Sequence, residues 1–331
     1  MADAPAPDSA SASTPGSLLA RPSALRIWLL AARPATLPAA VAGVVVGLGA
    51  ALGVGAAFRP DTALGCVAVA VLLQVIANFA NDLSDFRRGA DTPDRQGPVR
   101  VAAAGLVTER QLEAAIAIAV GCAGLVGLWL ALVGGPVIVG LGILAVVAAL
   151  AYTGGPFPYG YRALGEVFVF IFFGLVAVAG TAYLQALAMR PLFLVAAVPP
   201  GTLITAILVV NNLRDIPTDT AAGKRTLAVV MGRAATQREY VWLVAVAYGV
   251  PAALAGHWLV GGLGAASLLV LLPLLTLPMT RPLLAKVRGF GAPRELNLVL
   301  KGTARLSLVF SLLFALGLAL GEVAVPGGWP W

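Results

Sequence analysis

Residues 62–85 read TALGCVAVAVLLQVIANFANDLSD, an apolar run that ends in a cluster of amides and carboxylates. A run of about 20 apolar residues is long enough for a helix to cross the hydrocarbon of a bilayer. Carboxylates are costly in such a helix, at roughly 2.5 to 3.5 kcal/mol each near its centre, so they generally have a task. The stretch therefore predicts a membrane-spanning helix with a polar site at its end.

The composition of the chain supports the same class. Of its 331 residues, 60% are hydrophobic and 11% are charged, and the mean hydropathy is +0.93. These values exclude a water-soluble domain and indicate a polytopic membrane protein. Apolar stretches of about 20 residues occur nine times, which predicts an all-α fold with nine transmembrane helices. The predicted spans are residues 35–55, 62–82, 112–133, 136–153, 164–185, 191–212, 240–258, 260–280 and 301–321.

The basic residues favour one orientation of these spans. With the N-terminus in the cytoplasm and the C-terminus outside, all of the 22 Lys and Arg residues except Arg59 and Arg190 fall on the inner side, as the positive-inside rule requires. The net charge of +7 then reflects this bias together with an anion site, and nucleic acid is not implied. We expect an integral protein of the bacterial cytoplasmic membrane, with its polar clusters facing the cytoplasm.

The ends of the chain differ from the apolar region between them. Residues 1–22 are rich in Ala, Ser and Pro and lack a long apolar core, which predicts a disordered tail and not a signal peptide. Residues 23–325 are expected to form a single transmembrane domain, and residues 326–331 a short C-terminal tail.

Two polar clusters repeat one pattern. The first is Asn81-Asp82-Leu83-Ser84-Asp85, followed by Asp91, and the second is Asn212-Leu213-Arg214-Asp215, followed by Asp219. On a helix, spacings of three and four place these side chains on one face, where their repulsion favours a cation between them. Mg²⁺ suits oxygen ligands of this kind. The predicted metal ligands are Asn81, Asp82, Asp85, Asp91, Asn212, Asp215 and Asp219. The alternative for either cluster alone is a solvated loop in which each Asp pairs with a neighbouring Arg.

Basic residues follow both clusters and suit a metal-bridged diphosphate, whose remaining charge they would hold. The predicted diphosphate-binding residues are Arg95, Arg100, Arg162, Lys224 and Arg225. Arg162 lies in a loop rich in Gly and Pro, and an ion pair with Glu166, one helical turn away, is the alternative for it.

The motifs resemble those of the UbiA superfamily of intramembrane aromatic prenyltransferases. The resemblance rests on Asn-Asp-x-x-Asp with a further Asp, on Asn-x-x-Asp-x-x-x-Asp after a later helix, and on the nine predicted spans, and it covers residues 25–321. Ala32–Pro38, Gly154–Glu166 and Asn211–Leu227 are most similar to the branch that prenylates 1,4-dihydroxy-2-naphthoate. Asp91 lies six residues after Asp85, whereas the superfamily often has a spacing of four.

The resemblance implies transfer of a polyprenyl group from polyprenyl diphosphate to 1,4-dihydroxy-2-naphthoate, with loss of CO₂ and diphosphate, in menaquinone biosynthesis. It implies Mg²⁺ as cofactor and the bilayer as surroundings, with Asp85 and Asp219 as the catalytic candidates. The candidates for contact with the acceptor are Arg33, Tyr152 and Asn297. The alternatives are that Arg33 extends to the membrane surface and that Asn297 caps a helix.

Other functions remain open on the sequence alone. The same diphosphate machinery would serve 4-hydroxybenzoate, homogentisate, haem or a chlorophyllide as acceptor. A cation-coupled transporter is the alternative from another class, but transporter sites lie near the middle of the membrane. The acids of this chain lie at helix ends, which argues against transport.

Overall fold

The apolar runs form helices in the computed structural model, which describes residues 22–89, 97, 100–321, 325 and 329. Eight helical segments are long and apolar enough to cross a membrane, and a ninth, α5, is shorter. The described residues contain no β-strand. The predicted all-α class with nine apolar spans is therefore confirmed. The predicted tails, 1–22 and 326–331, lie almost entirely outside the described residues.

The first half of the bundle contains the helices that carry the first polar cluster. Its elements are α1 (Ala24–Ala32), η1 (Pro34–Thr36), α2 (Leu37–Gly53), α3 (Pro60–Arg87), α4 (Glu109–Gly134), α5 (Pro136–Ala151), η2 (Tyr159–Tyr161), α6 (Gly165–Val169), the π-helical η3 (Phe170–Val176) and α7 (Ala177–Ala186). The segment α6–η3–α7 is one continuous span.

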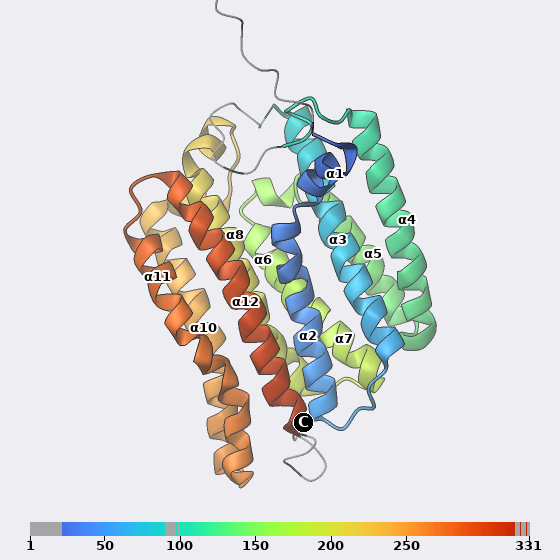
Figure 1. Cartoon of the computed structure of the whole chain (residues 1–331), viewed down its shortest axis with the longest axis vertical. Helices are drawn as coiled ribbons and strands as arrows, with labels where there is room; N and C mark the ends of the chain where they lie inside the picture. Colours follow the sequence, from blue (N-terminus) through green and yellow to red (C-terminus); the bar gives the residue numbers. More distant parts are fainter. Residues whose placement is uncertain (1–21, 90–96, 98–99, 322–324, 326–328, 330–331) are drawn as a thin grey trace, which may run out of the picture.

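The second half carries the second cluster. Its elements are α8 (Pro191–Ala221), α9 (Leu227–Met231), α10 (Arg233–Val260), η4 (Gly264–Thr276), α11 (Leu277–Arg288), η5 (Pro293–Glu295) and α12 (Leu296–Ala319). Here α2, α8 and α12 lie between the α3–α5 side of the bundle and the α10–α11 side (Figure 1).

Several helix ends differ from the sequence prediction. A short helix, α1, precedes the first span and ends where Arg33 adopts a left-handed conformation (φ 51°), since the following Pro34 disfavours the α conformation for it. The helix predicted over 191–212 continues as α8 to Ala221. The predicted span 260–280 is η4 with α11, which ends at Arg288, so Arg281 and Lys286 lie on a helix and not in a loop.

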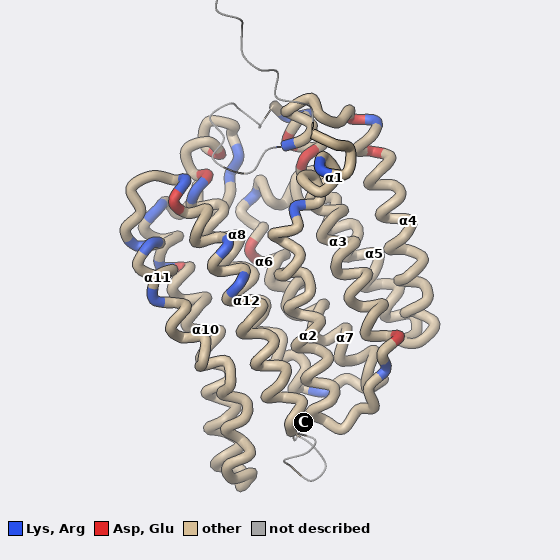
Figure 2. The backbone as a smooth tube through the Cα atoms, viewed as in Figure 1, with Lys and Arg blue, Asp and Glu red and all other residues tan. Residues whose placement is uncertain are grey.

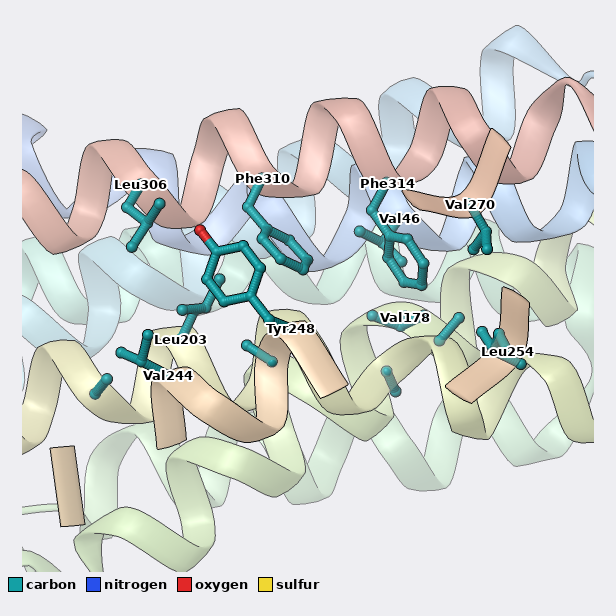
Figure 3. Close-up of a cluster of buried hydrophobic side chains, with 14 of the residues drawn as sticks. Val46, Val178, Leu203, Val244, Tyr248, Leu254, Val270, Leu306, Phe310 and Phe314 are labelled. Carbon is teal, nitrogen blue, oxygen red and sulfur yellow. The ribbon is translucent and has the colours of Figure 1, made fainter. Parts of the chain in front are cut away.

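The largest apolar core lies between α2, α7, α8, α10 and α12. Val46, Val178, Leu203, Phe310 and Phe314 meet there with their side chains buried (Figure 3). Tyr248 packs edge-on against Phe310, with ring centroids 5.2 Å apart. The hydroxyl of this tyrosine is hydrogen-bonded to Thr276, as a buried polar group requires.

Charged residues gather at one end of the bundle, where α3 ends and α4 begins (Figure 2). The long middle of the bundle is mostly uncharged, which matches a hydrocarbon layer. The two polar clusters lie toward the charged end, at the last turns of α3 and α8.

Candidate active site

A cavity of about 770 Å³ lies inside the bundle and joins a polar end to a long apolar part. Its polar end is lined by side chains of both clusters and of the loops that follow them. The apolar part extends between α3, α4, α5 and η3–α7. Concave sites that combine a small number of polar groups with an apolar wall are the usual form of a small-molecule site.

Lys224 connects the two clusters. Its Nζ lies 3.7 Å from Oδ2 of Asp85 on α3 and 3.9 Å from Oδ1 of Asp219 on α8. The turn after α8 brings the lysine back, since Gly223 has a φ of 70° and the backbone N–H of Lys224 donates to the Asp219 carbonyl. Two clusters that are far apart in the sequence therefore form one site.

Asp85 lines the cavity and is held by hydrogen bonds from two side chains. Nη2 of Arg100 donates to Oδ2 of Asp85 at 2.7 Å, and the Tyr161 hydroxyl donates to Oδ1 at 2.8 Å. The carboxylate is 1% exposed and Arg100 is 7% exposed. Burial, together with the Asp85 charge, raises the pKa of Tyr161 above its usual value. Tyr161 therefore keeps its proton and holds the carboxylate in place.

Asn81 and Asp82 face different surroundings although they are adjacent. Asn81 lines the cavity, and its Oδ1 accepts a hydrogen bond from Thr153 Oγ1 at 2.9 Å. Asp82 does not line the cavity. Its Oδ2 accepts from the Val101 backbone N–H at 3.0 Å, which anchors the chain segment of Arg100. Successive residues on a helix point about 100° apart, so Asp82 leaves the cavity wall that Asn81 and Asp85 share. Its partner Val101 is adjacent to Arg100, the partner of Asp85.

In the second cluster, Asp215 is held by its neighbour Arg214. Nε and Nη2 of Arg214 donate to the two carboxylate oxygens at 2.7 and 2.6 Å. Arg214 also donates to the side-chain oxygens of Asn297 and Asn211 at 2.7 and 2.8 Å. The arginine is 1% exposed. Asn297 therefore accepts a hydrogen bond from Arg214. It is not the helix cap that was the alternative, because the N-cap of α12 is Glu295.

Asn212 lines the cavity and is fixed from behind by Glu166. Its Nδ2 donates to Oε1 of Glu166 at 2.8 Å, and both residues are buried. The predicted alternative of an ion pair between Glu166 and Arg162 is absent among the described residues. Glu166, Arg214, Tyr161 and Lys301, the last of which also lines the cavity, were missed from the sequence as site residues. One feature of the sequence could have identified Arg214. It occupies the position in the second cluster that corresponds to Ser84 in the first, so the two clusters differ there.

The remaining predicted residues divide into three groups. Arg33, Tyr152, Asn297, Arg100 and Lys224 line the cavity. Arg162 and Arg225 are exposed, form an isolated backbone bridge with each other and do not line it. The Arg162 guanidinium lies over the Phe157 ring, 4.0 Å from its centroid. Asp91 and Arg95 fall outside the described residues.

The donor set fits Mg²⁺ in combination with a diphosphate. Asn81, Asp85, Asp215 and Asp219 present hard oxygen atoms to one cavity. Within the described part of the chain, no group of three or more His, Cys, Asp and Glu could hold a metal by itself. Mg²⁺ usually takes one or two carboxylates and completes its shell with water and substrate phosphate. The site therefore has the ligands for a metal shared with substrate, and it lacks a complete protein cage.

The sequence model of the UbiA prenyltransferase family matches residues 40–286, and the chain belongs to this family. It is an intramembrane prenyltransferase. Two of its relatives are 1,4-dihydroxy-2-naphthoate octaprenyltransferases. The enzyme from Mycobacterium tuberculosis is 44% identical over 90% of this chain and 98% of its own length, and that from Escherichia coli is 37% identical over 91% and 98%.

Solved structures show the same fold. A UbiA homologue from Aeropyrum pernix K1 has a TM-score of 0.61 at 18% identity and covers 84% of this chain and 96% of its own. A homologue from Archaeoglobus fulgidus, bound to DMAPP and Mg²⁺, has a TM-score of 0.58 at 15% identity, over 87% of this chain and 97% of its own.

Proposed function

We propose that this protein transfers a polyprenyl group from polyprenyl diphosphate to 1,4-dihydroxy-2-naphthoate in a Mg²⁺-dependent reaction that releases CO₂ and diphosphate. The product is demethylmenaquinol, the reduced form of demethylmenaquinone, an intermediate of menaquinone biosynthesis. The observation that carries the proposal is Lys224, whose ammonium lies between Asp85 and Asp219 at the polar end of a cavity with an apolar wall. The identity of the relatives supports the choice of acceptor.

The diphosphate lies at this polar end. Lys224 and Arg100 donate to its oxygen atoms, and Tyr161 holds Asp85 beside them. Mg²⁺, when bound, neutralises charge on the departing diphosphate. The predicted ligands that line the cavity, and would hold it there, are Asn81, Asp85, Asn212, Asp215 and Asp219. Asp82 does not line the cavity, and Asp91 lies outside the described residues. Of the predicted diphosphate ligands, Arg162 and Arg225 are exposed and do not line the cavity.

The acceptor lies between the diphosphate and the wall formed by η1 and α12. Arg33 pairs with the naphthoate carboxylate, and Tyr152 and Asn297 line the same space. The allylic carbon–oxygen bond breaks with its electron pair on the diphosphate, and the ring carbon attacks the allylic carbon. The carboxylate then leaves as CO₂, and its electron pair restores the aromatic ring. The apolar wall excludes water, which would otherwise quench the cation.

The protein is proposed to lie in the bacterial cytoplasmic membrane, with this site on the cytoplasmic side. The gathering of charged residues at the end of the bundle that holds the site supports this orientation (Figure 2), because cytoplasmic segments carry the excess of Lys and Arg.

The decisive experiment measures naphthoate prenylation by the purified protein with and without EDTA. Chelation should abolish turnover and added Mg²⁺ should restore it, and full activity in EDTA would contradict the metal assignment.

Replacing Asp85→Asn or Asp219→Asn should lower turnover by about a hundredfold or more, as losses of a preorganised electrostatic group do. Both variants keep the side-chain volume, so insertion into the membrane should be unchanged.

A matched control uses an acid outside the cavity. Glu109 forms an exposed ion pair with Arg87 at the start of α4. Such pairs contribute little to stability, so Glu109→Gln should keep the wild-type rate.

The acceptor assignment is tested by offering 4-hydroxybenzoate, homogentisate and the naphthoate with one prenyl donor. A faster reaction with either of the first two would overturn the assigned acceptor and leave the prenyl-transfer chemistry intact.

A further inference from the structure

The cavity amides of the two clusters are held by opposite ends. Asn81 is held by its oxygen, because Oδ1 accepts a hydrogen bond from Thr153 Oγ1 at 2.9 Å. Asn212 is held by its nitrogen, because Nδ2 donates to Oε1 of Glu166 at 2.8 Å. No described residue donates to Oδ1 of Asn212. The amide oxygen of Asn212 is therefore available to a ligand in the cavity that this residue lines.

The direction of this amide decides whether Asn212 can bind a metal. Asn212, Asp215 and Asp219 lie on one face of α8 and line the same cavity. The two ends of an amide are almost equal in size, but only the oxygen is an acceptor and a ligand for a hard cation. A reversed amide would turn its N–H groups toward the cation and repel it.

Glu166 lies behind the cavity wall. It is 6% exposed and does not line the cavity, so it reaches the site through Asn212. It belongs to the first turn of α6, at the start of the continuous span Gly165–Ala186. The free N–H groups of a first helical turn favour a negative charge. Glu166 is therefore placed to remain a carboxylate beside the amide.

The charge of Glu166 is not balanced by a cation. Its Oε2 is buried without a hydrogen-bond partner, and no described Lys or Arg forms an ion pair with it. A buried carboxylate in this state is costly, and a glutamine of the same shape would avoid the cost. A glutamine, however, can donate or accept, and would pair with either end of Asn212. A carboxylate only accepts, so it selects one direction of the amide.

We propose that Glu166 is a positioning residue, which turns Oδ1 of Asn212 into the cavity and thereby makes this amide a ligand of the metal that binds with the diphosphate. The inference rests on the proposed function, because it needs a metal at this site. It assigns Glu166 no contact with substrate. Residues that orient a metal ligand from behind typically change metal affinity by about 10- to 100-fold.

The test measures metal binding directly. Mn²⁺, which accepts the same oxygen ligands as Mg²⁺, is titrated into the purified protein with farnesyl thiolodiphosphate and no acceptor, and free Mn²⁺ is followed by electron paramagnetic resonance. Glu166→Gln should weaken Mn²⁺ binding about tenfold. Its unfolding midpoint should stay the same or rise, because an unpaired buried charge is removed. Wild-type Mn²⁺ affinity in Glu166→Gln would overturn the inference.

A second variant reverses the polarity of the hydrogen bond. In the double variant Glu166→Gln with Asn212→Asp, the new glutamine amide donates to one oxygen of the new aspartate and leaves the other oxygen to face the cavity. Mn²⁺ affinity should return at least to the wild-type value. A double variant that binds Mn²⁺ as weakly as Glu166→Gln alone would contradict the role in orientation.

Gln185→Leu is the matched control for loss of a buried polar contact. Gln185 lies at the opposite end of the same span, is 5% exposed and does not line the cavity. Its amide accepts from the Arg59 backbone N–H at 2.8 Å and donates to the Arg59 carbonyl at 3.1 Å. The variant should unfold at a lower temperature and bind Mn²⁺ normally. An equal loss of Mn²⁺ affinity in both variants would show a general effect of packing and overturn the inference.

Kinetics and the wild-type titration separate this inference from the proposed function. In Glu166→Gln the Mg²⁺ concentration for half-maximal turnover should rise about tenfold, whereas KM for the naphthoate should not change. If the wild-type protein binds no Mn²⁺ with the thiolodiphosphate, the proposed metal site fails and this inference fails with it. If the wild type binds Mn²⁺ and Glu166→Gln binds it equally well, only this inference fails.

Discussion

At the residue scale, the site is organised by cations that hold its carboxylates. Asp85 is held by Arg100 and Lys224, and Asp215 by Arg214. A buried charge is costly unless it is paired and hydrogen-bonded, and Arg214 satisfies this condition with three acceptors. The predicted alternative of acids paired with neighbouring arginines thus describes part of the contacts, but the pairs lie at a buried cavity and not in a solvated loop.

Arg214→Met should destabilise the protein, because it leaves the Asp215 carboxylate without its buried partner. Breaking such a pair costs about 3–5 kcal/mol. Thermal unfolding in detergent should show a clearly lower midpoint, and Arg214→Met combined with Asp215→Asn should recover part of the loss. Arg233→Met is the control, because Arg233 is exposed and pairs with no carboxylate among the described residues. It donates to the Phe290 carbonyl and lies over the Phe290 ring. An unchanged midpoint in Arg214→Met would show that the network contributes nothing to stability.

At the element scale, the small residues of α2 set the spacing of the bundle. A Cβ on Gly49 would lie 2.4 Å from the Ala315 carbonyl oxygen of α12, and one on Gly47 would lie 2.5 Å from the Val178 carbonyl oxygen of α7. Small residues let transmembrane helices approach closely. The contact positions α2 between α12 and α7, and thereby places η1 and Arg33 at the cavity.

Gly49→Leu should therefore prevent close packing of α2 on α12, since the obstacle is backbone that cannot rotate away. We expect overpacking to cost at least about 1–3 kcal/mol, observed as a lower unfolding midpoint and a lower yield of folded protein in detergent. Gly249→Leu on α10 is the control, because an added Cβ there meets nothing within 4 Å. Equal behaviour of the two variants would refute the close contact.

At the scale of the whole molecule, the distribution of charge predicts which end faces the cytoplasm. Arg288 ends α11 at the end that holds the site, whereas Arg190 precedes α8 at the opposite end. Both side chains are exposed. Their positions allow the orientation of the bundle to be tested directly.

In a background without Cys66 and Cys122, Arg190→Cys should react with a membrane-impermeant thiol reagent on intact spheroplasts. Arg288→Cys should react only after the membrane is permeabilised. The reverse pattern would place the site on the outer side and contradict the proposed orientation. Because labelling does not depend on turnover, the result is independent of the acceptor.

Much of the site could be predicted from residue type and spacing. Asn81, Asp85, Asn212, Asp215, Asp219, Arg100 and Lys224 were all selected from the sequence, and all line one cavity. Arg162 and Arg225 were selected in the same way, but they lie on the exposed side of their loops. Proximity in sequence to an acidic cluster does not determine the direction of a loop side chain, which depends on the turn that carries it.

The sequence by itself determined the membrane class, the nine apolar helices, the family and the pairing of two clusters, because hydrophobicity and residue spacing are local properties of the chain. Only the tertiary structure decided that Lys224 connects Asp85 and Asp219, that Asp82 faces Val101, and that Arg214 is buried among Asp215, Asn211 and Asn297. These contacts depend on how each helix is rotated about its axis. That rotation is set by packing against other helices, such as the contact of Gly49 with Ala315.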